Sequence, residues 1–411
     1  MGVVPVAAGP ACRALCGATK WNRFCKVSFA FDSGGRQNSG MVFFKDFLRR
    51  IGRFLDAGWS ALDLGGERVT VRLQNLIRSI TEMAEEKEGA PSPAKLDLLL
   101  YAPCPVKLVM KDEIERIVSR YSQRNVEVTV QVPMGCTSVD PFDPVYRLKD
   151  AGELPAIIAS IGFGDFWKKE FVDRFVRSKV FESVLPERVN PMFEKAAMID
   201  PRGCYTIYGV TPYIFLVDKR RLGALPVPRA WEDLLDSKYR GEIIMCGDGD
   251  DMADAVVLNI YKDRGSEGLK QLAGNVKSIM HSSQMAKIAG TEDPEGAAVF
   301  IIPCFFAQSA RVGGHVQVVW PEDGAAASPL YFLAKKSERE RLSELIAFFT
   351  DGFSTIDSAS WFLPLGGENL SGIPPEAKIK WIGWNFIEEN DVNRLRDELN
   401  LTFRAAQKGL P

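Results

Sequence analysis

The most informative stretch of the chain is Pro226-Val227-Pro228-Arg229-Ala230-Trp231-Glu232-Asp233-Leu234-Leu235-Asp236-Ser237-Lys238-Tyr239-Arg240-Gly241-Glu242-Ile243-Ile244. Its two prolines end one segment, and the apolar spacing over 231–235 predicts a short amphipathic helix. A polar turn that closes on Gly241 then leads into an apolar strand over 242–245. The stretch therefore predicts a helix, a turn and a strand in direct succession.

The flanking sequence continues this α/β pattern. Residues 96–101 and 126–132 predict apolar strands on either side of a charged helix over 111–122, which is how a βαβ unit begins. Residues 209–218 predict a long strand, and residues 342–349 predict a further helix.

The quoted stretch resembles the signature P-x-x-W-x-D-L-L-x-x-K-Y-x-G-x-I of extracellular solute-binding proteins, in the branch that serves ferric iron, thiamine, polyamines and related solutes. The sequence is also similar to that family at 209–218, 286–292 and Pro321-Glu322-Asp323-Gly324-Ala325. The likeness extends over about residues 95–395. It implies an α/β fold of the type 2 periplasmic-binding-protein kind, in which two lobes close on a ligand.

This resemblance, together with the pattern of the residues before it, predicts how the chain divides into domains. Apolar residues recur at helical spacing over 43–55 and 69–83, which predicts a small N-terminal helical module. The tail over 378–407 is expected to dock on lobe I. The expected parts are a disordered extension over 1–40, the helical module and linker over 41–92, lobe I over 93–212 plus 304–411, and lobe II over 213–303.

Composition limits the classes of partner. The 411 residues are 46% hydrophobic and 25% charged, which is ordinary for a globular protein. A net charge of −2 gives no electrostatic case for binding nucleic acid or an acidic membrane surface. The expected partners are a small-molecule or ion ligand and, through the resemblance, an ABC permease.

The N-terminal sequence predicts a cytoplasmic location. A secretory signal needs a basic start and an uninterrupted apolar core, whereas the first residues lack basic side chains and are broken by Pro5, Gly9 and Pro10. Eight cysteines also fit a reducing compartment. If the true N-terminus differs, the expectation becomes a periplasmic or extracellular location.

Four cysteines follow predicted strands: Cys104, Cys136, Cys246 and Cys304. Residues just past the carboxyl ends of strands line the ligand crevice of an open α/β sheet. Two interpretations stay open, because a cysteine can be a small buried hydrophobe or a thiolate ligand for a soft metal. No C-x-x-C spacing favours a preformed zinc or cluster site. We therefore predict a cysteine-lined cleft, with its metal unknown.

Other candidate ligand-binding residues lie in strand-end loops, at the start of a helix, or on and just before the long strand over 209–218. Lys107 could neutralise an anion or lower the pKa of the Cys104 thiol. Asp248 lies in an acidic, glycine-rich loop that could meet a cationic or hydroxylated ligand. Ser283 could cap a helix or help to bind an anion. The remaining candidates are Thr137, Tyr208, Tyr213 and Phe305.

The resemblance also bears on iron. Iron-binding relatives use an adjacent tyrosine pair after the strand that returns to lobe I, and the corresponding residues here are Cys304-Phe305-Phe306. Phenylalanine offers no oxygen to a hard cation, so the sequence argues against tyrosinate capture of iron. The sequence identifies no cofactor.

Catalytic motifs are missing from the sequence. It contains no Walker A, H-E-x-x-H or G-x-S-x-G pattern, and Gly162-Phe163-Gly164 lacks both a third glycine and a clear preceding strand. The sequence therefore favours a binding protein, either the substrate-binding component of an ABC-type transporter or a cytosolic relative of one. The alternative is a cytosolic enzyme or a metal- or thiol-dependent sensor that uses the strand-end cysteines on the same fold.

Overall fold

The computed structural model describes residues 92–133, 142–248, 251–310, 314–356, 358–359, 362–367, 373–374 and 376–409. The chain divides into two compact units, Met1–Thr81 and Glu82–Pro411, and every described residue belongs to the second. The extension over 1–40 and nearly all of the helical module over 41–92 lie outside the described residues. Those two predictions therefore stay predictions.

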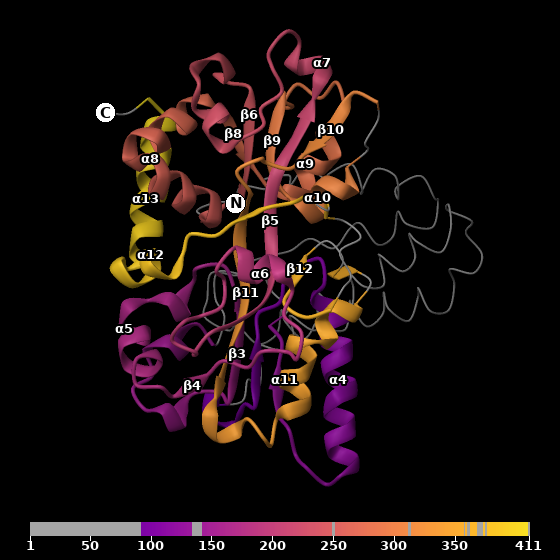
Figure 1. Ribbon diagram of the computed structural model, residues 1–411, viewed down its shortest axis with the longest axis vertical. Helices are drawn as coiled ribbons and strands as arrows, with labels where there is room; N and C mark the ends of the chain where they lie inside the picture. Colours follow the sequence, from indigo (N-terminus) through magenta and orange to yellow (C-terminus); the bar gives the residue numbers. More distant parts are fainter. Residues whose placement is uncertain are drawn as a thin grey trace, which may run out of the picture. The chain divides into compact units, whose positions relative to one another are not determined.

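The described residues form a mixed α/β structure (Figure 1). The strands are β1 (Leu98–Leu100), β2 (Val130–Gln131), β3 (Ile157–Ile161), β4 (Phe181–Glu182), β5 (Thr206–Asp218), β6 (Ile243–Asp248), β7 (Asp251–Met252), β8 (Val276–Met280), β9 (Val299–Pro303), β10 (Val316–Val319), β11 (Ala325–Lys335), β12 (Leu363–Pro364) and β13 (Ile379–Lys380). The α-helices are α4 (Lys107–Gln123), α5 (Lys169–Phe171), α6 (Pro191–Lys195), α7 (Lys219–Leu222), α8 (Asp254–Asn275), α9 (Ser282–Ile288), α10 (Cys304–Ser309), α11 (Ser343–Thr350), α12 (Trp384–Glu389) and α13 (Val392–Gln407).

Two long strands join the two lobes. The sheet runs in the order β2-β1-β3-β11-β5-β9-β6-β7, and Figure 1 shows β5 and β11 passing through the middle of the molecule. β5 pairs with β11 along its first half, and from Tyr213 onward it pairs with β9, beginning at Pro303. The sequence-based prediction of a crossing strand over 209–218 is therefore confirmed.

Alternation along the strands builds a core on both faces of the lobe I sheet. Leu98 and Leu100 pack with α4 and α11 on one face, whereas Leu99 packs with aromatic residues near α5 on the other. All three leucines are fully buried. A strand that is covered on both faces must be apolar throughout, which is why its sequence shows no alternation with polar residues.

The diagnostic stretch forms part of the scaffold of this unit. Residues Trp231–Leu235 form a 3₁₀ helix rather than an α-helix. The buried indole of Trp231 donates from Nε1 to the carbonyl oxygen of Gly324 at 2.8 Å and packs edge-on against Phe215. Gly324 has a φ of +105°, and a Cβ there would approach the backbone of Ile379 to 2.9 Å. The two similar segments, 226–244 and 321–325, are thus in direct contact.

The C-terminal tail corrects one expectation. We expected residues 378–407 to dock on lobe I, but α13 packs along α8, which lies in the predicted lobe II. Arg396 of α13 reaches Asp254 at 3.5 Å, and Gln407 donates to the carbonyl of Val276 at 3.3 Å. The tail still contacts the first lobe, because Asn393 donates to the carbonyl of Phe163. Its helices therefore bridge the two lobes.

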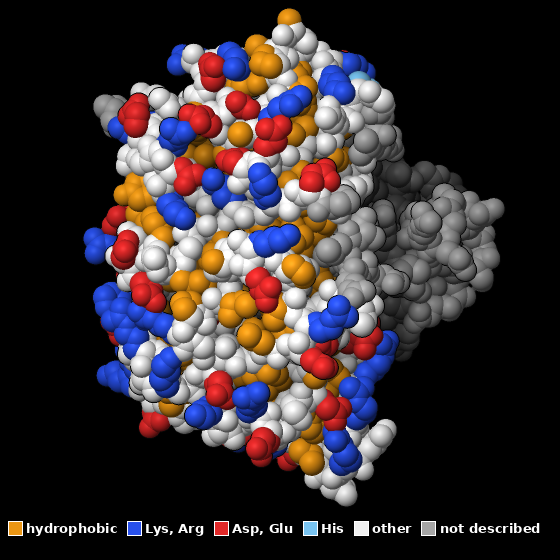
Figure 2. Space-filling model, in the orientation of Figure 1, with side chains coloured by type: hydrophobic (Ala, Val, Ile, Leu, Met, Phe, Trp, Pro, Cys, Tyr) orange, Lys and Arg blue, Asp and Glu red, His pale blue; other side chains and the backbone are white. Residues whose placement is uncertain are grey.

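Figure 2 shows basic and acidic side chains interspersed over one face, without a large patch of one sign. In the part of the chain that the structure describes, no helix has the length and apolar character needed to span a bilayer.

Candidate functional site

Strand directions bring the carboxyl ends of both lobes' strands toward each other. β1 is parallel to β3, and β3 and β5 are both antiparallel to β11, so β1 and β3 run in the direction of β5 toward the second lobe. β9 is antiparallel to β5, and β6 and β8 are parallel with β9, so these three run toward the first lobe. Ligands of open α/β sheets bind outside the carboxyl ends of the strands. The candidate site is therefore the set of loops that follow these strands.

A line of aromatic side chains crosses from one lobe to the other at these loops. Phe305 and Phe306 begin α10, lie edge to face at 5.2 Å and are half-buried. Phe306 lies 6.4 Å from the ring of His281, before α9, and Phe305 lies 6.1 Å from Phe362. The ring centroid of Phe353 lies 6.1 Å from that of Phe362, so Phe353 extends this line of aromatic rings. The half-exposed members offer an apolar surface to a ligand.

His281 is the polar residue at one end of this line of aromatic rings. Its Nδ1 accepts a hydrogen bond from the backbone N–H of Ser283 at 3.2 Å and lies 2.7 Å from the Ser283 hydroxyl oxygen. His281 therefore caps α9, and the proton of its neutral ring lies on Nε2. Ser283, which we predicted as a ligand residue, is engaged in this cap.

The amino-terminal end of α4 contributes a cation. Lys107 is the first residue of α4 and only 9% exposed. Val106, which precedes it, is buried in a large hydrophobic cluster against which the half-buried Phe305 also packs.

The cysteines differ in exposure. Cys104 is exposed in the loop after β1, whereas Cys246 on β6 and Cys304 on α10 are 3% and 1% exposed. Burial raises the pKa of the Cys304 thiol to about 11, so it is not a thiolate at neutral pH. Cys136 and Thr137 lie outside the described residues. Of the predicted site cysteines that the structure describes, two therefore pack as small hydrophobes.

Tyr208 corrects another expectation. It lies on β5 with no exposed surface and packs against Phe332, Phe349 and Phe353. Burial raises the pKa of its phenol well above the usual value. The side chain fills the core, so a ligand does not reach it in this conformation. Tyr213, farther along β5, is half-buried, and Asp248 ends β6.

Sequence reasoning missed β3 and the loop that follows it. Ile161 ends this strand and is 41% exposed, and Gly162 has a φ of +64°. A strand does precede Gly162-Phe163-Gly164, contrary to expectation. The apolar run Ile157-Ile158-Ala159 is the signal that could have revealed it. His281 and Phe306 were also passed over as ligand residues.

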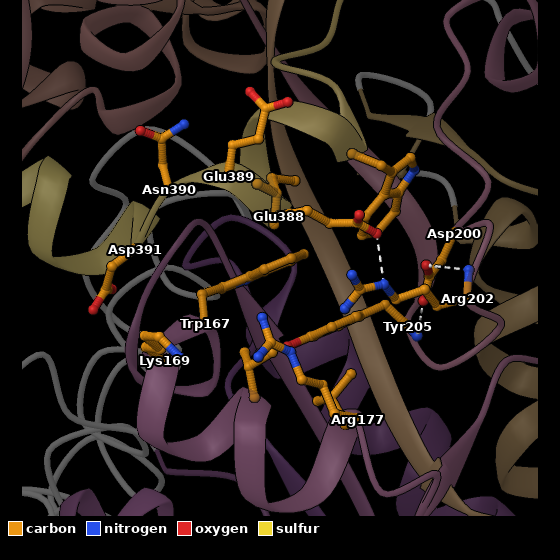
Figure 3. Close-up of a pocket in the computed structure, with 14 residues that line it drawn as sticks. Trp167, Lys169, Arg177, Asp200, Arg202, Tyr205, Glu388, Glu389, Asn390 and Asp391 are labelled. Carbon is orange, nitrogen blue, oxygen red and sulfur yellow. Dashed lines mark hydrogen bonds and ion pairs between the residues drawn. The ribbon is translucent and has the colours of Figure 1, made fainter.

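A separate pocket of about 110 Å³ lies between α5 and α12 (Figure 3). The rings of Trp167 and Tyr205 stack in parallel there at 4.2 Å. Its charged groups pair with neighbours: Arg202 Nε lies 2.5 Å from Glu388 Oε1, and Arg177 pairs with Asp173. None of the predicted ligand-binding residues lines this pocket. The residues that line this pocket, including the Arg202–Glu388 ion pair, attach α12 to the first lobe.

The described residues give no support to the metal- or thiol-dependent alternative. Among them, no group of three or more His, Cys, Asp or Glu side chains is arranged to hold a metal ion. The buried Cys246 and Cys304 do not form an accessible thiol set with Cys104.

Comparison with solved structures shows the fold. A ferric binding protein from Bordetella has a TM-score of 0.52 at 10% identity, over 76% of this chain and 98% of its own. A FutA (IdiA) protein from Trichodesmium, in complex with iron and citrate, has a TM-score of 0.52 at 9% identity, with the same coverage. An open conformation of ferric iron-binding protein A from Mannheimia haemolytica has a TM-score of 0.50 at 12% identity, over 76% and 98%. The two-lobed periplasmic-binding-protein fold is thereby confirmed.

Comparison of the sequence with curated proteins found no match. Residues 152–390, more than half of the chain, match the family described as bacterial extracellular solute-binding protein. Members of this family bind small ligands and work with ABC permeases. The chain belongs to the bacterial extracellular solute-binding proteins, the substrate-binding components of ABC transporters.

Proposed function

We propose that the protein binds an organic solute, rather than a bare ferric ion, between its two lobes. The observation that carries this proposal is the half-exposed pair Phe305 and Phe306 at the start of α10. Aromatic side chains without oxygen suit an apolar or aromatic part of a solute. They do not suit a hard cation, which prefers oxygen ligands.

The remaining site residues have supporting roles in this proposal. Tyr213 lies where β5 changes its pairing partner from β11 to β9. A change in the angle between the lobes would therefore move its side chain. Cys104 is exposed after β1 and is suited to the rim of the site. Cys136 and Thr137 remain predicted site residues, and Asp248, which was predicted in a loop, ends β6. Closure of the lobes around the solute would exclude water from the half-exposed rings.

Location and partner follow from the family. We infer that the protein acts outside the cytoplasmic membrane, because its family is extracellular, and that it delivers the solute to an ABC permease. The sequence-based expectation of a cytoplasmic location depended on the first residues, which lie outside the described part. Cell fractionation tests this inference, and recovery of the full-length protein only from the cytoplasm would contradict it.

Thermal-shift measurements test the ligand class. Organic solutes and ferric iron supplied as a soluble chelate are compared at equal concentration. A solute present at 100 times its Kd stabilises the folded state by about 2.7 kcal/mol. We expect stabilisation by organic solutes and none by iron. Stabilisation by iron alone would overturn the proposal.

Two variants test whether the solute binds at the start of α10. Phe305→Ala and Phe306→Ala should each weaken the binding of a stabilising solute about tenfold, which corresponds to about 1.4 kcal/mol. Phe386→Ala is the matched control, because Phe386 is also half-buried but lies on α12. Equal losses in all three variants would place the ligand elsewhere.

A further inference from the structure

We propose that the solute is polyhydroxylated and that its hydroxyl groups bind Thr211, Tyr213 and Ser328 on the two crossing strands. This inference rests on the proposed function, because it names the chemical class of the same ligand. The observations behind it come from β5 and β11 and are independent of the Phe305 and Phe306 pair.

The first observation is an interruption in the burial of the crossing strands. Every residue of β5 is buried except Thr211 and Tyr213. Every residue of β11 is buried except Ser328 and the last residue, Lys335. The three half-buried positions inside the two strands therefore all carry a hydroxyl group.

The strand register places these three side chains on one face, which we call the hydroxyl floor. Ser328 lies directly opposite Thr211. Opposite residues of an antiparallel pair share a face, with Cβ atoms about 5 Å apart. Tyr213 shares the face of Thr211, because side chains alternate along a strand. The hydroxyl floor thus spans both crossing strands between the lobes.

The second observation is that the fold does not use two of these hydroxyls. Within the described ranges, neither the Thr211 nor the Ser328 hydroxyl has a hydrogen-bond partner. Thr206 on the same strand differs, because it is only 1% exposed and its hydroxyl accepts a hydrogen bond from the Val184 N–H at 2.8 Å. Thr211 and Ser328 therefore keep a donor and an acceptor for an external group.

The third observation is the open space beside Ser328. Gly162 follows β3 and has a φ of +64°, and its N–H donates to the carbonyl of Pro329 at 2.9 Å. A Cβ at Gly162 would lie 3.8 Å from the Ser328 hydroxyl oxygen, so glycine leaves this hydroxyl uncovered. Ile161 lies opposite Leu330, on the same face of the sheet, and is 41% exposed. An apolar side chain therefore borders the hydroxyl floor in the first lobe.

The hydroxyl floor faces the same side of β5 as the aromatic line of the candidate site. Gly209 precedes Thr211 by two residues and shares its face, and a Cβ at Gly209 would approach the ring of Phe353 to 3.1 Å. Toward the second lobe, Tyr213 pairs with Pro303, and α10 begins at the next residue. One solute can therefore contact the rings and the hydroxyls together.

This combination specifies the chemical class of the solute. A hydroxyl both donates and accepts hydrogen bonds, whereas an ammonium group only donates and a carboxylate only accepts. Because the hydroxyl floor extends over about 5 Å between opposite strands, a solute needs more than one polar group to cover it. A sugar or a glycoside presents several hydroxyl groups and an apolar face that can rest on aromatic rings.

Probes that share a phenyl ring and differ in their polar group test the inference on the unmodified protein. Phenyl β-D-glucoside carries several hydroxyl groups and benzyl alcohol carries one. Benzoate only accepts hydrogen bonds, and benzylamine at neutral pH only donates them. D-Glucose has the hydroxyl groups without the phenyl ring. We expect phenyl β-D-glucoside to raise the Tm most at millimolar concentration, benzyl alcohol and D-glucose to raise it less, and the two charged probes to have no effect.

The outcomes separate this inference from the proposed function. A larger rise with benzoate or benzylamine than with phenyl β-D-glucoside would overturn recognition by hydroxyl groups but leave an organic ligand in place. Equal rises with D-glucose and phenyl β-D-glucoside would support the hydroxyl floor and count against the aromatic contact. Stabilisation by chelated iron alone would overturn both. A series in which no probe changes the Tm would contradict the polyhydroxylated solute.

Thr211→Val and Ser328→Ala test the hydroxyls themselves, with Thr402→Val as the control. Valine has the shape of threonine without its hydroxyl, and Thr402 is also half-buried but lies on α13. The affinity for phenyl β-D-glucoside should fall about fivefold in each site variant, as the loss of one neutral hydrogen bond predicts, and less than twofold in the control.

A second measurement distinguishes binding from a structural role. The ligand-free Tm of Thr211→Val and Ser328→Ala should be unchanged or higher, because neither hydroxyl has a partner within the described ranges. Unchanged affinity in both variants, or a loss that Thr402→Val matches, would overturn the assignment. A lower ligand-free Tm with unchanged affinity would show that these hydroxyls have a structural role only.

Discussion

At the scale of single residues, Trp231 connects segments that lie far apart in the sequence. Its hydrogen bond to Gly324 joins residues 93 positions apart, and its ring packs on Phe215 of β5. Asp323 also accepts a hydrogen bond from the Trp231 backbone at 3.3 Å. The residue that makes the family recognisable therefore stabilises one lobe and takes no direct part in the proposed ligand site.

Replacement of Trp231 tests this structural role. Trp231→Ala should lower the free energy of unfolding by about 3–5 kcal/mol, because it leaves a large cavity. Trp231→Phe retains most of the ring and should cost about 1–3 kcal/mol, since the buried carbonyl of Gly324 loses its donor. Urea denaturation measures both values. If Trp231→Phe is as stable as the parent, the hydrogen bond has no net stabilising role.

The cysteines should differ in their reaction with iodoacetamide. Cys104 is exposed and should be alkylated at neutral pH, whereas Cys304 is buried and its thiol pKa is raised to about 11. Peptide mapping by mass spectrometry distinguishes the two sites. In the folded protein the rate at Cys304 should rise with pH up to about pH 11. Equal rates at pH 7 would contradict the burial of Cys304.

Titration of the Cys304 thiol also affects the stability of the folded protein at alkaline pH. A thiol whose pKa is higher in the folded than in the unfolded protein stabilises the folded state fully at pH values below the unfolded pKa. For Cys304 this contribution is lost as the pH rises from about 9 toward about 11. Cys304→Ala should therefore show a smaller loss of stability across this range than the parent protein does.

At the scale of elements, the C-terminal helices connect the lobes. The ring centroid of Trp384, on α12, lies 6.0 Å from that of Trp167 and 6.1 Å from that of Tyr205, both in the first lobe. α13 packs along α8 in the second lobe, and Lys380, just before α12, pairs with Asp263 of α8 at 2.7 Å. Any change in the angle between the lobes must be accommodated by this bridge.

Variants of α12 test the attachment to the first lobe. Trp384→Ala should lower the free energy of unfolding by about 3–5 kcal/mol, since Trp384 is only 8% exposed. Glu388→Gln removes the ion pair with Arg202, which is partly exposed and should contribute less than about 1 kcal/mol. Denaturation curves for both variants provide the comparison. A larger effect for Glu388→Gln would mean that charge, rather than ring packing, holds α12.

Elements with strong local patterns could be predicted from the sequence, and elements fixed by distant contacts could not. The strand over 96–101, the crossing strand and α11 each follow from apolar runs and helical spacing. The docking of α13 on α8 was missed because either lobe can cover an amphipathic helix. For the site, the strand-end rule selected loops at the carboxyl ends of strands, and their role in binding stays a prediction. It could not distinguish buried Tyr208 and Cys304 from half-exposed Phe305, because burial depends on the neighbouring segments.

At the scale of the whole molecule, the arrangement of strands explains how binding and motion are linked. β5 and β11 run through both lobes, and the carboxyl ends of the remaining parallel strands face each other across them. Small changes in β5 near Tyr213 would rotate one lobe against the other. A ligand held between the two lobes would favour the closed arrangement.

The most direct test is a crystal structure of the protein with the organic solute that raises its Tm most. We predict that the solute lies between the lobes, with its apolar part in contact with Phe305 or Phe306. A solute bound instead in the pocket between α5 and α12, or held by the lobes without contact to α10, would contradict this account.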